Sequence, residues 1–336
     1  MKDYSSIVVS SNIKLLRNLA GFDFPSTLNQ NSGIKVLNKL ADTILKIDDS
    51  FKIYKISSLS ELDVNIMFEK NLISNTLKES NEFGAVVLSG DEEIAIMLND
   101  TDHIVETSSK KGLSLISAYD RLNVIDNEIL SRLDVAYDDN LGFLTSNLNM
   151  VGTGLVASVD LFLPALSQTG KIKNVLSGIS NQGFEIQMLS DGYQKNGEYI
   201  CSIYNSQTIG KRESDFIVKL TEIAIKVSEM EIQARKELLG LAYKDEIVDR
   251  VYRAWGILTN CYKITTQEAQ KYLSDLKIGI AIDVIRFKGN DFIDNLLNDI
   301  MPYSLTKISD SKVAVADLDK YRAKFLTNIL KSRRIK

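Results

Sequence analysis

The sequence predicts an α+β fold in which an antiparallel sheet flanked by helices precedes an all-helical C-terminal domain. The segments AVVLS and EIAIML, joined across Gly90 and Asp91, have the pattern of a β-hairpin. VASVDLFL (residues 156–163) alternates polar and apolar residues with the period of a strand. After Ser214 the hydrophobic pattern is wholly helical. Because strands and helices mix in the first part and only helices follow, two domains are expected.

The same periodicities justify the N-terminal elements in order. Residues 31–44 place apolar side chains on one helical face, and FKIYKI begins a strand at Phe51. Residues 112–133 repeat apolar side chains at near-helical spacing. The strand that follows ends near Leu163, because Pro164 cannot continue the hydrogen-bonded ladder. Further strands around residues 186 and 203 complete the predicted sheet.

Four helices are expected in the C-terminal part. A long helix runs from Ser214 to about residue 242, and a second covers residues 243–259. Thr265 and Glu268 have the spacing of a capping box that begins a third. The last helix carries an apolar stripe made of Leu318, Phe325 and Ile329. No linker rich in Pro, Gly or Ser separates the parts, and the predicted domains are residues 1–230 and 231–336.

Composition limits the class of protein. The chain has 336 residues, 44% of them hydrophobic, and a net charge of −4, which is no basic excess of the kind that nucleic-acid binding needs. Two cysteines and a single histidine give neither a disulfide framework nor the spacing of a metal site. No apolar run is long enough to span a bilayer, and no charged-then-apolar leader is seen. A cytoplasmic protein that binds neither nucleic acid nor membrane is expected.

One segment points to a family. Residues 145–159, TSNLNMVGTGLVASV, resemble T-S-C-P-T-N-x-G-T-G-x-R-A-S-V of the guanidino kinases. Four collinear segments extend the resemblance over nearly the whole chain: SSNIKLLRN (10–18) is similar to S-S-R-I-R-L-A-R-N, FEKNLIS (68–74) to V-E-K-H-L-I-S, NDTDHIV (99–105) to N-E-E-D-H-x-R, and IQMLSDG (186–192) to V-R-G-x-Y-G-E. Within the guanidino kinases the chain looks most similar to the bacterial protein arginine kinases, which implies their catalytic-domain fold for the first part.

The resemblance also implies where a nucleotide and a guanidinium would bind, and at most of these positions the residue type has changed. The positions matched to nucleotide-binding arginines and a histidine are Asn12, Lys14, Asn71, Val105, Val156 and Gln187. The positions matched to the two catalytic glutamates and the cysteine are Thr101, Gly192 and Asn147. Only Lys14 keeps a positive charge, and lysine lacks the bidentate fork with which arginine grips phosphate.

The expected consequence is a strongly reduced reaction. Neither threonine nor glycine acts as a general base near neutral pH, although the neighbouring acids Asp100, Asp102 and Asp191 remain. Losing one preorganised charge-stabilising donor costs about 3 kcal/mol in the transition state, and several are replaced here. We also expect a reduced, less basic cleft in which Val105 and Val156 are buried and the loop at residues 190–197 closes over the site.

Other polar residues have structural interpretations beside the functional ones. The single histidine, His103, is expected to be structural, and Cys201 and Cys261 to be small core residues. In protein arginine kinases the C-terminal region dimerises and carries an R-D-x-x-R-A phosphoarginine pocket, which corresponds here to LDKYRA, residues 318–323. Asp319 and Arg322 either form an i,i+3 ion pair or make a weakened phosphoarginine site.

The predicted function is therefore that of a protein arginine kinase relative with an impaired reaction, a pseudokinase that acts by binding proteins. By resemblance its partners are a second copy of itself, a zinc-binding adaptor, a heat-shock repressor and the Clp unfoldase-protease. Dimerisation is expected through a surface containing Val251, Tyr252, Trp255 and Leu258. No cofactor or metal is expected. The alternatives are an active kinase that uses ATP and magnesium with a rearranged site, and a phosphoarginine-binding module.

Overall fold

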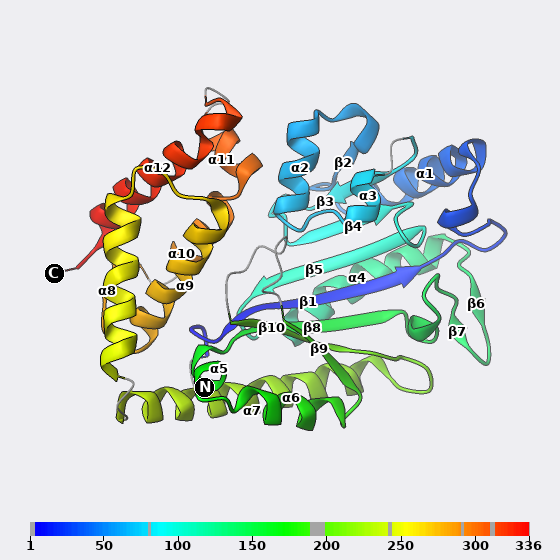
Figure 1. Ribbon diagram of the computed structural model, residues 1–336. Coiled ribbons are helices and arrows are strands. Elements are labelled where there is room, and N and C mark those ends of the chain that lie inside the picture. The colour runs from blue at the N-terminus through cyan, green and yellow to red at the C-terminus, as the bar shows by residue number, and fades with distance from the viewer. Residues whose placement is uncertain are drawn as a thin grey trace. The chain divides into compact units, whose positions relative to one another are not determined.

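A computed structural model describes residues 4–79, 82–188, 199–240, 244–289, 292–309 and 313–335. The chain forms two compact units (Figure 1). The first unit consists of Met1–Leu161, Ser177–Ile186 and Ser202–Lys226, and the second of Phe162–Leu176, Gln187–Cys201 and Val227–Lys336. Gly192 and the whole of the predicted closing loop lie outside the described residues.

An eight-stranded sheet is the centre of the fold, with the strand order β2-β3-β4-β5-β1-β8-β10-β9. The pairs β2–β3, β3–β4, β4–β5, β5–β1 and β1–β8 are all antiparallel, which confirms the predicted α+β class. The strands are β1 Val8–Arg17, β2 Lys52–Lys55, β3 Ala85–Leu88, β4 Ile94–Leu98, β5 Ile104–Lys111, β8 Leu155–Phe162, β9 Phe184–Met188 and β10 Ile200–Asn205. A separate small hairpin pairs β6 (Tyr137–Asp138) with β7 (Gly142–Phe143).

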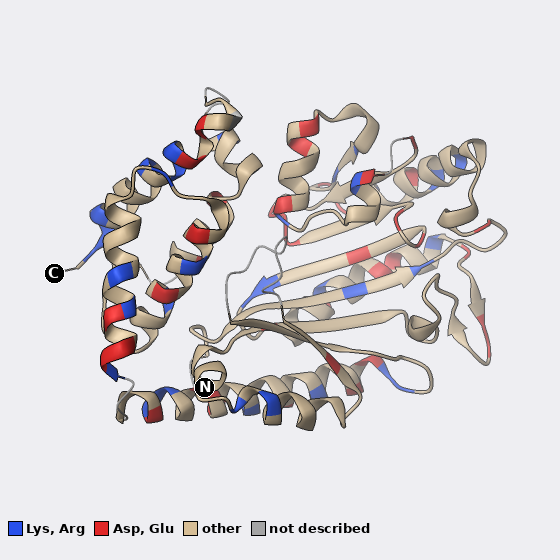
Figure 2. Ribbon diagram, viewed as in Figure 1, with Lys and Arg blue, Asp and Glu red and all other residues tan. Residues whose placement is uncertain are grey.

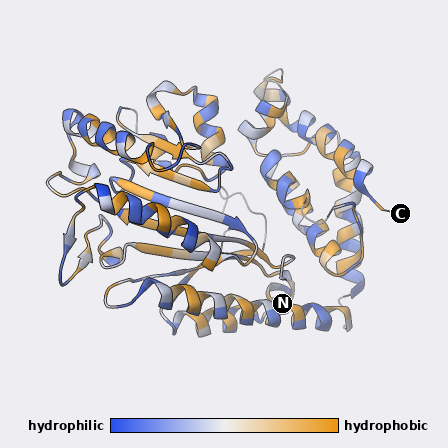
Figure 3. Ribbon diagram, turned by 180° about the vertical axis from the view of Figure 1, so that it is seen from behind, coloured by the Kyte–Doolittle hydropathy of each residue, from blue (hydrophilic) through white to orange (hydrophobic). Residues whose placement is uncertain are grey.

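Helices cover the sheet on both faces. The helix α4 (Leu115–Arg132) packs on β1 and β5 and buries its apolar side. On the other face, α2 (Glu61–Glu69) and α3 (Asn75–Glu79) contribute Val64 and Leu77 to an apolar cluster with strand residues. Strand ribbons are mostly apolar in colour, whereas helix surfaces alternate (Figure 3). The other helices of this part of the chain are α1 (Gln30–Ile44), α5 (Pro164–Gln168), α6 (Ile172–Ser180) and α7 (Glu213–Gly240).

The register of the central strands assigns each residue to one face of the sheet. Lys14 lies directly opposite Thr107 on β5 and Val156 on β8, so these three side chains share a face. Leu15 lies opposite Glu106 and belongs to the face under α4. In β8 buried and half-buried residues alternate from Leu155 to Asp160, as the sequence pattern predicts.

The helical part of the second unit is built from α8 (Lys244–Asn260), α9 (Thr266–Ala281), α10 (Phe292–Asp299), α11 (Pro302–Ile308) and α12 (Leu318–Arg333). The predicted capping box is confirmed, because Thr265 and Glu268 each bond the other's backbone N–H. The stripe predicted on the last helix is confirmed at Leu318, which is buried, but not at its two other positions. The buried side chains of α12 include Leu326 and Leu330, whereas Phe325 and Ile329 are only half-buried. Successive residues of a helix are rotated by about 100° around its axis, so a shift of one position is enough to turn a side chain out of the core.

The predicted dimer surface was also wrong in part. Val251 and Leu258 are fully buried, because α8 packs on both α9 and α12 with that face. Trp255 is half-buried, with the Arg334 guanidinium 4.5 Å from its ring centroid. Only Tyr252 is exposed. Within the part of the chain that the structure describes, no helix has the length and apolarity that a membrane span requires.

Candidate functional site

The glycine-rich segment that begins β8 is fixed by close backbone contacts. Gly152 and Gly154 have φ angles of 123° and 66°, which favour glycine. A Cβ atom at Gly154 would lie 2.6 Å from the carbonyl oxygen of Leu16, whose own N–H donates to the carbonyl of Gly154 at 3.0 Å. The two glycines therefore allow β1 to approach at Gly154, and Thr208 and Ile209 to approach at Gly152.

Four of the positions matched to nucleotide-binding residues meet on one face of the sheet. Asn12 and Lys14 lie on β1, and the strands on either side carry Val105 and Val156. The amide of Asn12 donates to Asp160 Oδ2 at 3.2 Å and accepts a bond from the Ser109 hydroxyl at 2.6 Å. Lys14 is exposed. This half of the face is polar and close to neutral in charge.

The other half of the face is apolar. Val105 is 3% exposed and belongs to a buried cluster, and Val156 packs against that cluster while half-buried. The burial expected of these two valines is therefore complete for Val105 and partial for Val156. The remaining members come from the strands, α2, α3 and the turns around them: Leu16, Ile56, Val64, Leu72, Ile73, Leu77, Val86, Leu88, Ala95, Met97 and Met150. We call this set with Val105 and Val156 the valine cluster.

The two remaining described nucleotide positions are on the surface. Asn71 is exposed in the turn after α2, where its φ of 60° places it in the left-handed region that asparagine tolerates. The next two residues, Leu72 and Ile73, belong to the valine cluster, so this turn is attached to the same face. Gln187 is exposed on the edge strand β9. Neither residue adds a positive charge.

Two neighbouring loops bring the described acceptor positions together. The Ser146 hydroxyl donates to the carbonyl oxygen of Thr101 at 2.7 Å, which places Thr101 beside Asn147. Thr101 is exposed, and the side-chain oxygen of Asn147 accepts the N–H of Asn149 at 3.0 Å at the start of the short helix η3 (Leu148–Met150). Asn147 thus has a local structural role at the position matched to a reactive cysteine.

The acids that remain near Thr101 are buried and hydrogen-bonded. Asp102 accepts bonds from the Asn18 amide at 2.5 Å and from the Ser146 N–H at 2.7 Å. Asp100 is 5% exposed and accepts the Ser74 hydroxyl at 2.5 Å. Burial raises the pKa of the Asp100 carboxyl, although the Ser74 bond and the nearby charge of Lys14 oppose the shift.

His103 has the structural role that the sequence predicts. It is fully buried, and its Nδ1 accepts the N–H of Leu19 at 3.1 Å. A ring nitrogen that accepts a bond carries no proton, so the imidazole is neutral. Desolvation also lowers the pKa of His103 below its usual value. Cys201 is fully buried, as expected, while Cys261 is half-buried and burial raises the pKa of its thiol.

A buried charge network under α4 was missed by sequence reasoning. Arg17 is 1% exposed, and its guanidinium binds both carboxylate oxygens of Asp126, at 3.0 and 2.7 Å. Glu106 is fully buried beside this pair, and Glu213, 3.8 Å from Arg17, accepts the Tyr119 hydroxyl at 2.5 Å. Desolvation and then the charge of Asp126 raise the pKa of Glu106 well above its usual value. In the sequence, this network is indicated only by an arginine within a strand, Arg17, and an acid within an amphipathic helix, Asp126.

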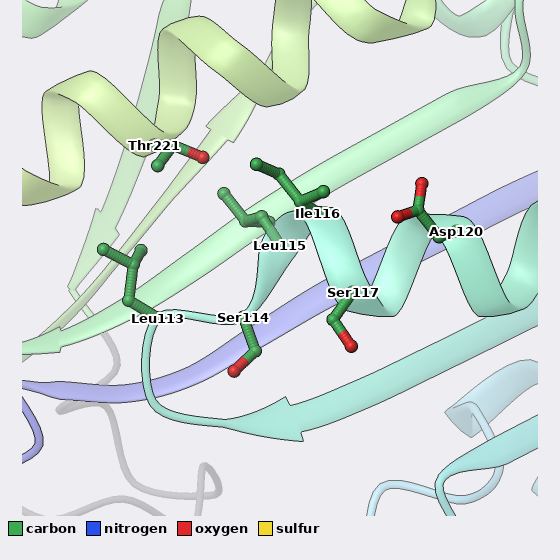
Figure 4. Close-up of a pocket in the computed structure, with 7 residues that line it drawn as sticks. All are labelled: Leu113, Ser114, Leu115, Ile116, Ser117, Asp120 and Thr221. Carbon is green, nitrogen blue, oxygen red and sulfur yellow. The ribbon is translucent and has the colours of Figure 1, made fainter.

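A hollow elsewhere in the first unit is lined mainly by apolar and hydroxyl side chains. It measures about 380 Å³ and lies between the start of α4 and α7 (Figure 4). Of its lining residues only Asp120 is charged. The hydroxyls of Ser114 and Ser117 are engaged, since Ser114 donates to the Lys111 carbonyl and Ser117 accepts from Lys110. Among the described residues no group of three or more His, Cys, Asp or Glu could hold a metal ion.

In the second unit, the guanidinium of Arg322 serves structure. It is 2% exposed and donates to the carbonyl oxygens of Ile300 and Ile264, both at 2.9 Å, and to Asp319 at 2.5 Å. The predicted i,i+3 pair with Asp319 is confirmed. These contacts join α12 to the ends of two neighbouring segments and leave little of the guanidinium for a ligand.

Family models match both parts of the chain. The model of the ATP:guanido phosphotransferase, C-terminal catalytic domain, matches residues 34–234, and that of the protein-arginine kinase McsB C-terminal domain matches residues 244–335. The protein-arginine kinase of Clostridium tetani is 31% identical over 330 residues, which are 98% of this chain and 97% of that protein. The protein-arginine kinase of Bacillus subtilis is 32% identical over 324 residues, covering 95% of this chain and 88% of that protein.

Solved structures agree on the fold. The duplicated taurocyamine kinase from Schistosoma mansoni with bound transition state analog components superposes with a TM-score of 0.65 at 20% identity. The superposition covers 80% of this chain and 39% of that duplicated one. At this identity the similarity concerns the fold alone.

Proposed function

This chain belongs to the ATP:guanido phosphotransferase family, and on that premise we propose that it is a pseudokinase of protein-arginine kinase type that acts by binding proteins. The observation that carries the proposal is the valine cluster. Val105 and Val156, at positions matched to phosphate-binding arginines, are packed among aliphatic side chains on the face of the sheet.

Phosphoryl transfer from ATP requires that the spread negative charge of the triphosphate be neutralised by preorganised cations. Lys14 is the one cation among the six matched positions, four of which lie on this face. An aliphatic surface also cannot replace the water that a triphosphate gives up on binding, so desolvation of the phosphates there is unfavourable. Weak nucleotide affinity and a slow reaction follow from the same residues.

The acceptor side supports the same conclusion. A general base must reach the guanidinium within hydrogen-bond distance. Thr101 has no titratable group, and the carboxylate of Asp102 already accepts two bonds from the surrounding loops. In-line positioning of a guanidinium between two carboxylates is therefore not supported by the residues described.

An active kinase is the second candidate, and one observation favours it. Asp100 is a buried carboxyl with a raised pKa near Lys14, which is the property of a general base. In that case ATP and magnesium are the cofactors. A phosphoarginine-binding module is less favoured, because Arg322 is engaged with Asp319 and two carbonyl oxygens.

The partners in this proposal come from the family resemblance. They are a second copy of the chain, a zinc-binding adaptor, a heat-shock repressor and the Clp unfoldase-protease, in the cytoplasm. Dimerisation would need a surface other than Val251 and Leu258, because both are buried within the second unit.

The proposal is tested by incubating the full chain with ATP, magnesium and an arginine-rich protein, and by mapping phosphoarginine with mass spectrometry. We expect no stoichiometric modification, and no saturable heat of binding when ATP is titrated with or without magnesium. The Bacillus subtilis relative, treated in parallel, serves as the positive control for the assay. Stoichiometric phosphoarginine formed by this chain would restore the active-kinase candidate.

A further inference from the structure

Five basic side chains are exposed where the end of α12 meets the segment between α9 and α10. The N–H of Lys288 donates to the carbonyl oxygen of Arg333 at 2.8 Å. The N–H of Ile335 donates to that of Arg286 at 3.0 Å, so the two stretches are held side by side. The exposed cations are Arg286, Lys288, Lys331, Arg333 and Arg334, and we call them the basic surface. Figure 2 shows Lys and Arg in blue at the end of α12, beside the label C.

The register of this contact places two like charges opposite each other. Phe287 and Arg334 form an antiparallel bridge, so Lys288 lies directly across from Arg333. Arg286 is two residues from Lys288 and falls on the same face. Like charges opposite each other on paired strands repel and destabilise the pairing. An anion bound between them would remove this repulsion.

Ion pairs within the fold neutralise little of the basic surface. Residues 283–292 and 331–336 contain six Lys or Arg and two Asp. Asp283 pairs with Arg286, and Asp291 lies outside the described residues. Across the described residues, the other four members of the basic surface make no ion pair. The negative end of the helix dipole favours cations on the last turn of α12, but it does not explain Arg286 and Lys288.

The neighbouring helices add no net negative charge beside the basic surface. The helix α8 contributes Trp255 to it, and residues 250–260 of that helix contain two arginines and no acid. Those arginines pair with acids elsewhere on α8 and on α9. In the first turn of α10, Asp294 pairs with Lys277. The cations therefore remain in excess when the packed neighbours are included.

Aromatic rings fix two of the guanidiniums. The Arg334 guanidinium lies 4.5 Å from the ring centroid of Trp255, and that of Arg333 lies 5.4 Å from the ring centroid of Phe292. Phe287 joins the two rings, with centroid separations of 5.8 Å to Trp255 and 5.0 Å to Phe292. A guanidinium held over a ring loses less conformational freedom when it binds, and its planar fork of donors suits a carboxylate.

We propose that the basic surface docks an acidic segment of a partner protein, with carboxylates of Asp or Glu bound between Lys288 and Arg333 and beside Arg286. Each arginine would donate two N–H bonds to a carboxylate, and Lys288 would act as a point charge. Such a segment needs contact only with this surface, because salt screens charges beyond about 8 Å. Nucleic acid and anionic membranes extend further and would also meet a chain whose net charge is −4, so their binding is opposed.

This inference rests on the protein binding in the proposed function, and it names the chemistry of one partner. It does not depend on the loss of the kinase reaction, because no residue of the basic surface is at a position matched to nucleotide or guanidinium binding. Asp319 and Arg322, the positions matched to a phosphoarginine pocket, are not part of it either.

The test is fluorescence anisotropy of a labelled, unstructured peptide of alternating Glu and Ser, titrated with the full chain in the absence of nucleotide. We expect Lys288→Gln with Arg333→Gln to weaken binding about tenfold and to flatten its salt dependence. The matched control is Lys263→Gln with Lys271→Gln, which makes the same change in charge at exposed positions of the second unit outside the basic surface. The control should bind the peptide as the unmodified chain does.

Stability supplies an independent readout. Because Lys288 and Arg333 repel each other, Lys288→Gln should raise the midpoint of thermal unfolding at low salt. Added salt should remove this gain, since it screens the repulsion in the unmodified chain. A lower midpoint that salt does not change would mean that the two cations are compensated within the fold, which contradicts the proposal.

Equal peptide binding by the doubly substituted and the unmodified chain would overturn the proposal, as would equal binding of a peptide of alternating Lys and Ser. Tighter binding of a single-stranded oligonucleotide or of phosphatidylserine vesicles, lost in the same variant, would overturn it in favour of an extended polyanion. A lower mass of the variant in light scattering, without any peptide binding, would overturn it in favour of a second copy of the chain. Phosphoarginine formation in the kinase assay would end the pseudokinase proposal and leave this measurement unaffected, so the two failures are distinguishable.

Discussion

The two faces of the central sheet differ in the charged side chains that they carry. On the face under α4, Arg17 is buried with a full set of partners. On the opposite face, the same strand presents Asn12 and Lys14, and its neighbours present Val105 and Val156. All belong to segments that resemble guanidino kinase motifs. Arg17 is held by buried structural contacts, whereas Asn12, Val105 and Val156 on the opposite face carry no charge.

The largest expected effect in this comparison is the loss of Arg17. Arg17→Ala leaves Asp126 as a buried carboxylate without its partner and removes donors to the carbonyls of Leu16 and Thr153. Breaking a buried pair in this way costs about 3 to 5 kcal/mol of stability. Lys14→Ala, three residues away on the exposed face, should change stability by less than about 0.5 kcal/mol.

Urea unfolding of both variants, followed by circular dichroism, measures this difference. The comparison fails if the midpoints of Arg17→Ala and Lys14→Ala shift by similar amounts. Because the chain has two compact units, the shift should be confined to the transition that reports on the sheet.

Replacing each of the two valines by arginine should cost different amounts of stability. Val105→Arg places a charge inside the valine cluster and should destabilise the chain by about 3 kcal/mol. Val156→Arg is at a half-buried position from which a long side chain reaches solvent, so its expected cost is less than about 1 kcal/mol. Thermal unfolding of each variant gives the ranking. Equal costs would show that the valine cluster does not exclude charge at Val105.

The sequence predicted the features that depend on interactions between residues close together in the chain. The hairpin across Gly90, the alternation in β8 and the capping box at Thr265 each need only neighbouring residues, and all three are present. In the stripe of the last helix Leu318 is buried as predicted, but Leu326 and Leu330 are buried in place of Phe325 and Ile329, which are half-buried. Which of two adjacent apolar residues faces a core depends on the packing partner, and a single helix does not contain that information.

The sequence indicates which positions match the site of the family, but it does not predict how buried those positions are or what they contact. The matched positions Asn12, Lys14, Val105 and Val156 lie on one face of the sheet, because the register of the strands sets which residues are neighbours. Whether Val105 was exposed depended on α2 and α3 covering that face. The network of Arg17, Asp126 and Glu106 joins residues far apart in the chain, and no local pattern indicates such a contact.

The smallest expected effect concerns Glu106, and it depends on pH. The groups facing it are Arg17 from β1, Asp126 from α4 and Glu213 from α7. Because burial raises the pKa of Glu106 in the folded chain, the folded state holds a proton that the unfolded state has lost above the usual pKa of about 4.5. Stability therefore falls as pH rises from that value towards the folded pKa.

Glu106→Gln keeps the shape of the neutral side chain but cannot titrate, so it should reduce this slope and stabilise the chain by about 1 to 2 kcal/mol near neutral pH. Urea midpoints of the two proteins between about pH 5 and pH 8 measure the slope, with the exposed Glu222→Gln as the matched control. Parallel pH profiles of Glu106→Gln and the unmodified chain would mean that Glu106 is ionised in the fold, and the face under α4 would then hold uncompensated charge.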